Sequence, residues 1–439
     1  MADALAYSRR RRLEAQLSVH GERVESWLER RERADVLHQH RTQLRSIGNL
    51  LRGFLDGLRD DAEAVAGATT EDVYEACRTL EEDLAWLQRL WDYFRQRFDQ
   101  RDDPDLQALL RAADDVAWSC YSPAVRRAEQ MGLSTRDVCP LPFVEYFISP
   151  AATTGTWVPD DLAPRGSRLG QTLRQLPLAF VHLPAEAVIS PHWLVFVAHE
   201  VGHCVQHELG LVEPFRQHVQ TGLVAKGASP SEAEDWAGWS EEVFADAFAA
   251  RLMPRSATRA LVEFVRAPAA IMVRRRILHP PPLVRLTFLA ALAKQNEDEA
   301  STQLAGLDLA ALEAASPPET CRLCDLAHNL AEVVREPIGQ GGVKLAALGS
   351  PAGWAEPQGR HIAAPRTLVE RAMERWMGRV EQSPAASAET LAKDAEGLLR
   401  SLTTYRPEGE RASGTESAQA LGRALRDAVR ADRQAGAGG

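Results

Sequence analysis

Two histidines four residues apart, with a glutamate directly after the first, form the segment HEVGH at residues 199–203. On a helix, side chains four apart project from one face, so His199 and His203 can share one metal ion. Glu200 is turned by about 100° from His199, which keeps it off the metal but near a water bound there. The spacing predicts a water-activating zinc site. The alternative is two core histidines beside a surface glutamate.

A catalytic zinc ion usually has three protein ligands and one open position. A longer form of the motif would place a third histidine at 209, where this chain has Leu209. The segment WSEEVFADAFAARLMP, residues 239–254, offers a glutamate instead. Glu242 is the expected ligand, and Asp246, four residues on, is the expected acceptor for a ligand histidine's N–H. Glu241 is the alternative ligand, and Glu242 would then be one of several acids on a solvated face.

The pattern HEVGH followed by Glu242-x-x-x-Asp246-x-Phe248 resembles the gluzincin zinc metallopeptidases, and EEVFADAFAARLMP is similar to the glutamate helix of the ImmA/IrrE group of cytosolic bacterial peptidases. The segment HPPPLVRLTFLAAL has the form HPxxxxRL, which resembles the His-Pro segment of CAAX-prenyl and heat-shock membrane endopeptidases. The resemblance spans residues 175–295, about a quarter of the chain. It implies that the ligands expected above hold Zn²⁺ and that Glu200 is the general base.

The same resemblance implies that His279 stabilises an oxyanion, while Arg285 orients it or binds substrate carbonyls. The alternative is a purely structural role, in which the prolines form a turn that starts a helix and Arg285 lies on the surface. Two departures matter. The membrane relatives have spanning helices, which this chain lacks, and the ImmA/IrrE group normally lacks the His-Pro element.

The elements that must position these residues predict a mainly α fold with a small β-sheet (α+β). We expect an N-terminal helical bundle over residues 1–135 and a zincin-like metallopeptidase domain over 136–300. A helical C-terminal region follows over 301–405, and residues 406–439 are expected to be a mobile tail, because their apolar content is low.

Local signals refine the predicted peptidase domain. Short apolar runs at 142–149 and 177–184 predict strands, and the segment 151–167 between them predicts a loop. Ser190 is expected to cap the HEVGH helix, with Pro191 in its first turn. A substrate strand is expected to pair with a sheet edge near residues 178–182.

Composition narrows the function classes. The formal net charge is -10 and the pI is about 5.7, which argues against nucleic-acid binding. No apolar run approaches the roughly 18 residues of a membrane span, and the charged N-terminus lacks a signal core. We therefore expect a cytoplasmic protein, and its arginine-rich, lysine-poor composition suggests a bacterial source. Cys321 and Cys324 form a lone CxxC, a weak zinc or redox signal with the alternative of two small helix residues.

These observations predict a zinc-dependent peptidase that cleaves a protein or peptide substrate, with endopeptidase cleavage favoured over exopeptidase cleavage. The main alternative is a regulatory or partner-binding protein on a retained zinc-peptidase fold, with gated or negligible activity. The N-terminal helices would then dock a regulatory partner. The intact Glu200 disfavours this alternative, and a glutamate ligand disfavours a purely structural zinc site.

Overall fold

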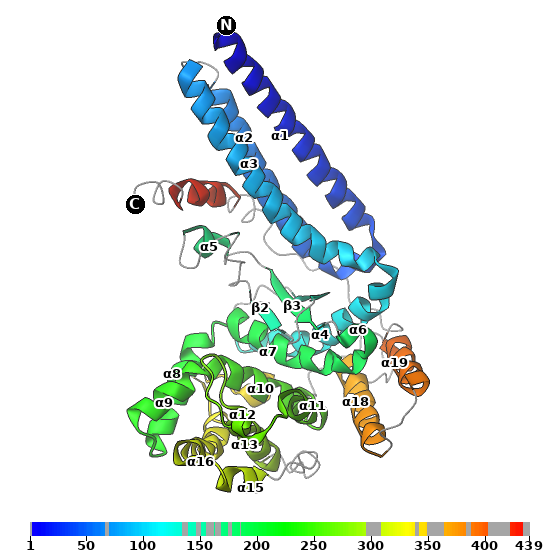
Figure 1. Ribbon diagram of the computed structural model, residues 1–439, viewed down its shortest axis with the longest axis vertical. Helices are drawn as coiled ribbons and strands as arrows, with labels where there is room; N and C mark the ends of the chain where they lie inside the picture. Colours follow the sequence, from blue (N-terminus) through cyan, green and yellow to red (C-terminus); the bar gives the residue numbers. More distant parts are fainter. Residues whose placement is uncertain are drawn as a thin grey trace. The chain divides into compact units, whose positions relative to one another are not determined.

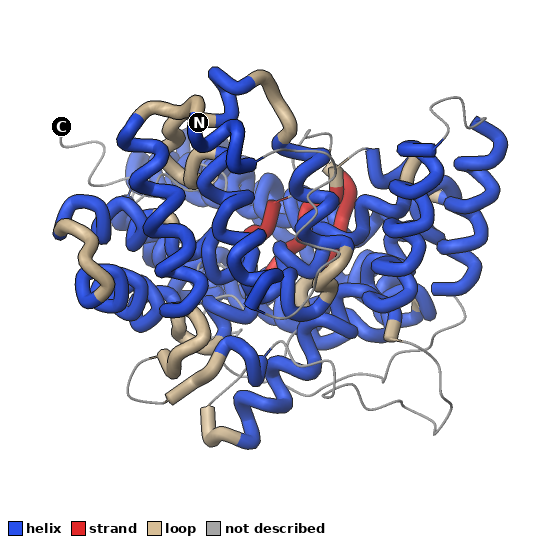
Figure 2. The backbone as a smooth tube through the Cα atoms, turned by 90° about the horizontal axis from the view of Figure 1, so that it is seen from below, coloured by secondary structure: helices blue, strands red, loops and turns tan. Residues whose placement is uncertain are grey.

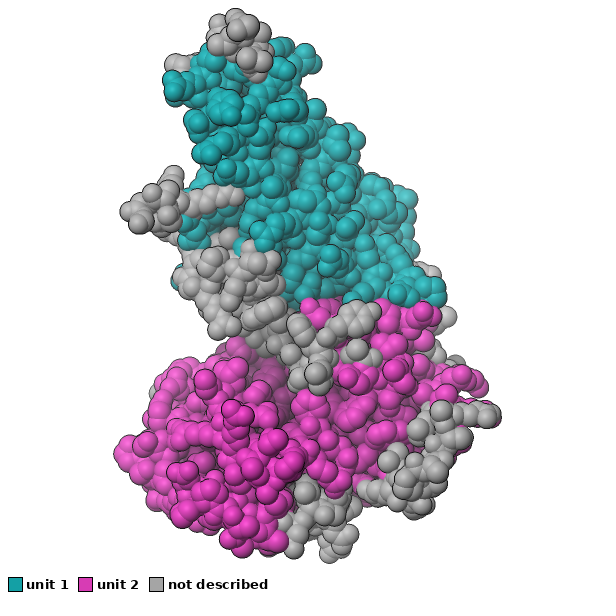
Figure 3. Space-filling view, in the orientation of Figure 1, with its two compact units in different colours: residues 1–104, 153–180, 408–439 teal, residues 105–152, 181–407 magenta. Residues whose placement is uncertain are grey.

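The computed structural model describes residues 2–65, 70–133, 139–145, 151–154, 162, 168–173, 178–184, 186–295, 309–338, 342–348, 364–382, 388–402 and 422–432. Helices dominate these residues, as predicted, and the strands form one small sheet (Figure 2). The chain divides into two compact units (Figure 3). Unit 1 comprises residues 1–104, 153–180 and 408–439, and unit 2 comprises residues 105–152 and 181–407.

Unit 1 is built on three long helices that contact one another pairwise (Figure 1). Aromatic side chains fill the space between them, with the rings of Trp27 and Trp91 6.4 Å apart in an edge-to-face arrangement. The elements of this unit are α1 (Ala2–Arg33), η1 (Asp35–His40), α2 (Arg41–Ala64), α3 (Thr70–Asp99), η3 (Gln100–Asp102) and α5 (Arg168–Leu173). These aromatic side chains are therefore part of the core of unit 1.

Residues 422–432 also form a helix, which belongs to unit 1. Leu425, Ala428 and Val429 are buried, and Arg430 pairs with Asp61 of α2. The assignment of residues 406–439 to a mobile tail stays a prediction, but residues 422–432 are helical and packed. Their apolar side chains recur at helical spacing, which the low average apolar content of the tail concealed.

Unit 2 carries all the residues singled out above for metal chemistry. Its helices up to the candidate site are α4 (Pro104–Gln130), α6 (Glu186–Ile189), η4 (Pro191–Phe196), α7 (Val197–Glu208), α8 (Val212–Ala225), α9 (Pro230–Gly238) and α10 (Ser240–Leu252). Its later helices are α11 (Ser256–Val265), α12 (Ala269–Met272), α13 (Pro282–Gln295), α15 (Leu309–Ala314), α16 (Pro318–Val333), α17 (Leu345–Leu348), α18 (Pro365–Gln382) and α19 (Ala388–Leu402). Cys321 and Cys324 lie on α16 as free thiols.

The sheet has three strands in the order β1 (Leu141–Val144), β3 (Ala179–Leu183), β2 (Ala151–Thr154). The predicted strands at 142–149 and 177–184 correspond to β1 and β3. The predicted loop at 151–167 was wrong at its start, where the β-branched threonines of AATT extend as β2. The predicted substrate-pairing edge near residues 178–182 was also wrong. Because β3 is the central strand, both of its edges are hydrogen-bonded to neighbours.

The HEVGH helix begins differently from the prediction. Residues Pro191–Phe196 form a 3₁₀ helix, and α7 starts only at Val197. The side chain of Ser190 makes no capping hydrogen bond and instead lies 3.2 Å from His192 Nδ1. The continuous 3₁₀-to-α backbone leaves no free α-helix start for Ser190 to cap. Among the described residues, no helix is long and apolar enough to cross a membrane.

Candidate metal centre

The close contact between α7 and α10 creates the site. A Cβ atom added to Gly202 would lie 2.9 Å from the Cα of Ala245 and 3.3 Å from the Cβ of Phe248, so only glycine permits this approach. On the other side of α10, Phe244 packs edge-to-face on Phe215 of α8 with ring centroids 5.2 Å apart. Buried Phe244 thus docks α10 in the core, while Glu242 faces the histidines of α7.

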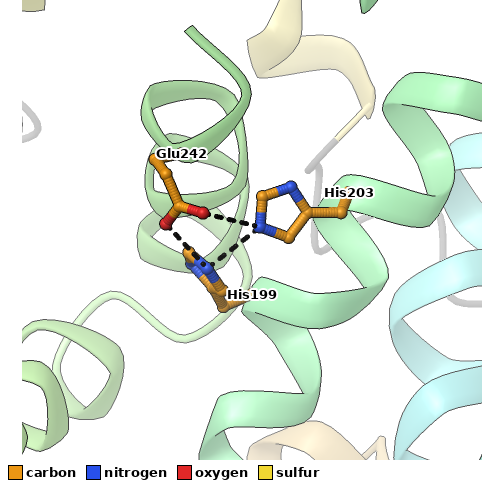
Figure 4. A group of neighbouring side chains, drawn as sticks. All are labelled: His199, His203 and Glu242. Carbon is orange, nitrogen blue, oxygen red and sulfur yellow. Dashed lines mark hydrogen bonds and ion pairs between the residues drawn. The ribbon is translucent and has the colours of Figure 1, made fainter. Parts of the chain in front are cut away.

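Three predicted ligands come together at this contact (Figure 4). Their ligand atoms all lie within 4.8 Å of one another. The two carboxylate oxygens of Glu242 each lie 3.5 Å from one histidine Nε2 atom, one from His199 and one from His203. Two imidazoles and a carboxylate, all largely shielded from solvent, therefore converge on one point from two helices.

The predicted contact of Asp246 is also present. Its Oδ1 atom lies 2.9 Å from Nδ1 of His199, the ring nitrogen that faces away from Glu242. Arg285 clamps the same carboxylate, with Nε donating to Oδ2 at 2.6 Å and Nη2 donating to Oδ1 at 2.7 Å. Burial raises the pKa of Asp246, but the Arg285 guanidinium and His199 outweigh it and hold the pKa below its ordinary value. Asp246 is therefore ionised and orients His199.

Arg285 contacts the carboxylates of both Asp246 and Glu242 and is not a surface residue. It is buried, and its Nη2 atom also lies 3.2 Å from Oε2 of Glu242. Burial lowers the pKa of His199, but Asp246 and Glu242 reverse this and raise it to about 10. Burial likewise raises the pKa of Glu242, while the neighbouring histidines lower it well below its ordinary value. The cluster as a whole favours bound positive charge.

His279 reaches the site from the turn before α13. Its Nδ1 atom lies 3.1 Å from Oε2 of Glu242, although the two atoms do not meet with hydrogen-bond geometry. The alternative ligand, Glu241, points elsewhere and pairs with His207 at 2.8 Å. The structure thus separates the two adjacent glutamates of α10, one toward the cluster and one toward the helix surface.

Glu200 is buried, and this burial raises the pKa of its carboxyl above the ordinary value. Its electrostatic neighbours include His182 of β3, a residue that sequence reasoning did not select. Nδ1 of His182 lies 2.5 Å from a carboxylate oxygen of Glu145, which follows β1. The only sequence signal was a histidine at an inward position of an apolar strand. That signal is weak, because strand histidines are commonly core residues.

The chemistry of this donor set fits a divalent cation. When Glu200, Glu242 and Asp246 are ionised and the histidines are neutral, as metal ligands must be, Arg285 offsets only one of the three negative charges, and a divalent ion would balance the other two. Oε2 of Glu242 is a buried oxygen without a hydrogen bond among the described residues. The Nε2 atoms of the two histidines are only 3.2 Å apart, and two lone pairs at that distance need a proton or a cation between them. His199, His203 and Glu242 can therefore hold a metal ion.

Comparisons of the chain with protein-family models, with curated proteins and with solved structures found no match.

Proposed function

We propose that the protein is a zinc-dependent peptidase that hydrolyses peptide bonds within a protein substrate. The observation that carries the proposal is the convergence of His199, His203 and Glu242, with Glu200 on the same helix as the two histidines. Two imidazoles and one carboxylate are a ligand set of catalytic zinc sites, which leave a position open for water or substrate. Structural zinc sites are usually closed by cysteine and histidine, and no cysteine joins this cluster among the described residues.

Glu200 is the general base in this proposal. Zinc, when bound, supplies a Lewis acid that makes a water molecule acidic near neutral pH and polarises the scissile carbonyl. The Glu200 carboxylate accepts a proton from the water and passes it to the nitrogen of the leaving amine. Its burial beside the ligands supports this role, because a raised pKa brings a carboxylate closer to the basicity that this proton transfer requires.

The remaining side chains orient a metal ligand or stabilise the charge that develops on the substrate. Asp246 accepts the Nδ1–H of His199, which leaves the Nε2 lone pair directed at the metal position. Arg285 keeps Asp246 ionised, and its Nε and Nη2 atoms are engaged by the carboxylates of Asp246 and Glu242, so we assign it an orienting role and do not assign it the binding of substrate carbonyls. His279 is partly exposed beside Glu242, where an N–H donor would meet the negative charge that develops on the carbonyl oxygen.

The test combines metal content with hydrolysis. Wild type, His203→Ala and Glu200→Gln are purified, their zinc content is measured by mass spectrometry, and cleavage of denatured casein is followed. We expect about one zinc ion per chain in wild type and Glu200→Gln, as the three-ligand site requires. We expect loss of zinc in His203→Ala and loss of hydrolysis in both variants.

His207→Ala is the matched control, since His207 lies one turn further on the same helix and pairs with Glu241 instead of facing the metal position. It should keep both zinc and hydrolysis. If zinc is bound but no form hydrolyses casein, the peptidase proposal is wrong and the alternative of a regulatory protein on a retained zinc-peptidase fold is favoured. Absence of zinc from wild type after incubation with the ion would overturn the proposal.

A further inference from the structure

The segment between α12 and the metal position carries apolar side chains in solvent. Ile277 is 93% exposed and Leu278 is 73% exposed, directly before His279. Ile271 of α12, 43% exposed, precedes them. Single exposed apolar residues are common on protein surfaces, but this exposed pair is directly adjacent to a residue of the candidate metal site, where another molecule could cover it.

This segment also carries positive charges that form no ion pair with the described residues. Arg274 and Arg276 are exposed, and neither forms an ion pair with any residue that the structure describes. Arg275, between them, pairs with Asp235 of α9 and lies over the ring of Trp239. The chain as a whole is acidic, with a formal net charge of -10. The two unpaired arginines are therefore a local basic site, next to the two exposed aliphatic side chains.

The segment is anchored at both ends. Arg275 attaches it to α9, and Met272 of α12 is fully buried. At the other end His279 lies 3.1 Å from Glu242, and Arg285 of α13 is bound to Asp246. The apolar pair is therefore held outward by fixed neighbours on either side, and the chain leads directly from it into the metal site.

We propose that residues 274–278 are a substrate-recognition surface, which selects a peptide segment with apolar side chains flanked by acidic residues. Carboxylates of the substrate would pair with Arg274 and Arg276, and its apolar side chains would cover Ile277 and Leu278. This deepens the proposed function and rests on it, because the surface borders the proposed catalytic centre. An anionic membrane is the less favoured occupant, since two free arginines and two aliphatic side chains give only weak, reversible membrane binding.

Binding is measured without hydrolysis, in the full-length Glu200→Gln protein loaded with zinc. The probe is a short fluorescein-labelled peptide with two leucines between pairs of aspartates, and fluorescence anisotropy gives its Kd. We expect the probe to bind at least about tenfold more tightly than the same peptide with asparagines in place of the aspartates. The double charge reversal Arg274→Glu with Arg276→Glu should abolish this difference. Ile277→Ser with Leu278→Ser should weaken both peptides.

Matched controls come from the same unit. Ile189→Ser removes an aliphatic side chain that is 85% exposed, and Arg375→Glu reverses an exposed arginine on α18. Neither should change the Kd. Equal binding of both peptides, or binding that the 274–278 variants leave unchanged, would overturn the surface even if casein is hydrolysed. Selective binding that the variants abolish would support it even if hydrolysis is absent.

A final arm tests the membrane. Vesicles of phosphatidylcholine with phosphatidylserine are titrated with the same proteins in a sedimentation assay. If wild type binds these vesicles more tightly than the acidic peptide, and the Ile277→Ser with Leu278→Ser variant does not, the occupant is a lipid surface and the substrate proposal is wrong. Absence of vesicle binding supports the peptide.

Discussion

A chain of three contacts controls the metal position at the scale of single residues. Arg285 holds Asp246, Asp246 holds Nδ1 of His199, and His199 presents Nε2 beside Glu242. Each contact fixes the protonation state of the next group, because an ionised aspartate requires the N–H of His199 on its own side. When His199 is neutral, as a metal ligand must be, its Nε2 lone pair then faces the metal position. Asp246 is thus expected to affect metal affinity without touching the metal.

We predict that Asp246→Ala weakens zinc binding by about 10- to 100-fold, the usual effect of losing the acceptor behind a ligand histidine. It should also destabilise the fold by about 3–5 kcal/mol, because Arg285 loses its bidentate partner inside the protein. Competition with a chromogenic chelator gives the affinity, and chemical denaturation of the metal-free protein gives the stability. Glu241→Gln on the same helix is the control. A zinc affinity equal to that of wild type would show that His199 is oriented without Asp246.

The residues that could hold a metal ion could be selected from sequence because their spacing is local. His199 and His203 share a helix, and the pairing of Glu242 with Asp246 on a second helix supplies the remaining groups. The exposure and contacts of Arg285 depend on how α13 packs, which no local spacing determines. His182 was missed for the same reason, since strand β3 brings it toward Glu200 only through the tertiary fold.

At the scale of elements, the site depends on how closely α7 approaches α10. Gly202 sits at the closest point, where an added Cβ would meet the Cα of Ala245 at 2.9 Å. Backbone atoms cannot move aside as a flexible side chain can, so a larger residue must push the helices apart. The same displacement would separate the two histidines from Glu242.

We predict that Gly202→Ala lowers the free energy of unfolding by about 1–3 kcal/mol, as overpacking usually does. It should also weaken zinc binding. The matched control is Gly378→Ala in the C-terminal part of α18, where an added Cβ meets nothing within 4 Å. The control should gain up to about 1 kcal/mol, because alanine has the higher helix propensity. Urea denaturation of both variants measures the difference, and a stabilised Gly202→Ala would contradict the close approach.

Element types were more predictable than element roles. Long amphipathic helices such as α2 and α3 follow from apolar spacing alone, since burial of one helix face needs no knowledge of the partner. The position of β3 in the middle of the sheet is a fact of strand order, which local patterns do not contain. The start of α7 was missed because a 3₁₀ turn and an α-helix share similar backbone angles.

At the scale of the whole molecule, a buried acid makes stability depend on pH. Asp115 of α4 is buried with neither carboxylate oxygen hydrogen-bonded among the described residues, and burial together with Asp114 raises its pKa to about 9. The folded protein therefore keeps this proton while the unfolded chain releases it near its ordinary pKa. Stability from this group is complete below the ordinary pKa and is lost as pH rises toward about 9.

We predict that Asp115→Asn flattens this dependence, because asparagine has the shape of the protonated acid but no titrating proton. Between pH 5 and 8 the wild-type free energy of unfolding should fall by about 1.4 kcal/mol per pH unit through this group alone. The variant should be the more stable protein at pH 8, with a smaller difference at pH 5. Urea denaturation at several pH values checks the slope. If the free energy of unfolding depends equally on pH in wild type and in Asp115→Asn, Asp115 is not the group that holds the proton.

Metal binding should also stabilise the molecule, because the three ligands come from helices that are adjacent only in the folded state. An unfolded chain separates His203 from Glu242, so zinc binds the folded form preferentially and raises its stability by about 2.7 kcal/mol at a concentration 100 times the dissociation constant. We predict that zinc raises the thermal midpoint of wild type and of Glu200→Gln, because residue 200 is not one of the proposed zinc ligands. Zinc should not raise the thermal midpoint of Glu242→Ala, which lacks a proposed ligand. Differential scanning fluorimetry over a zinc titration measures this. A shift in Glu242→Ala equal to that of wild type would mean that zinc stabilises the protein from another site.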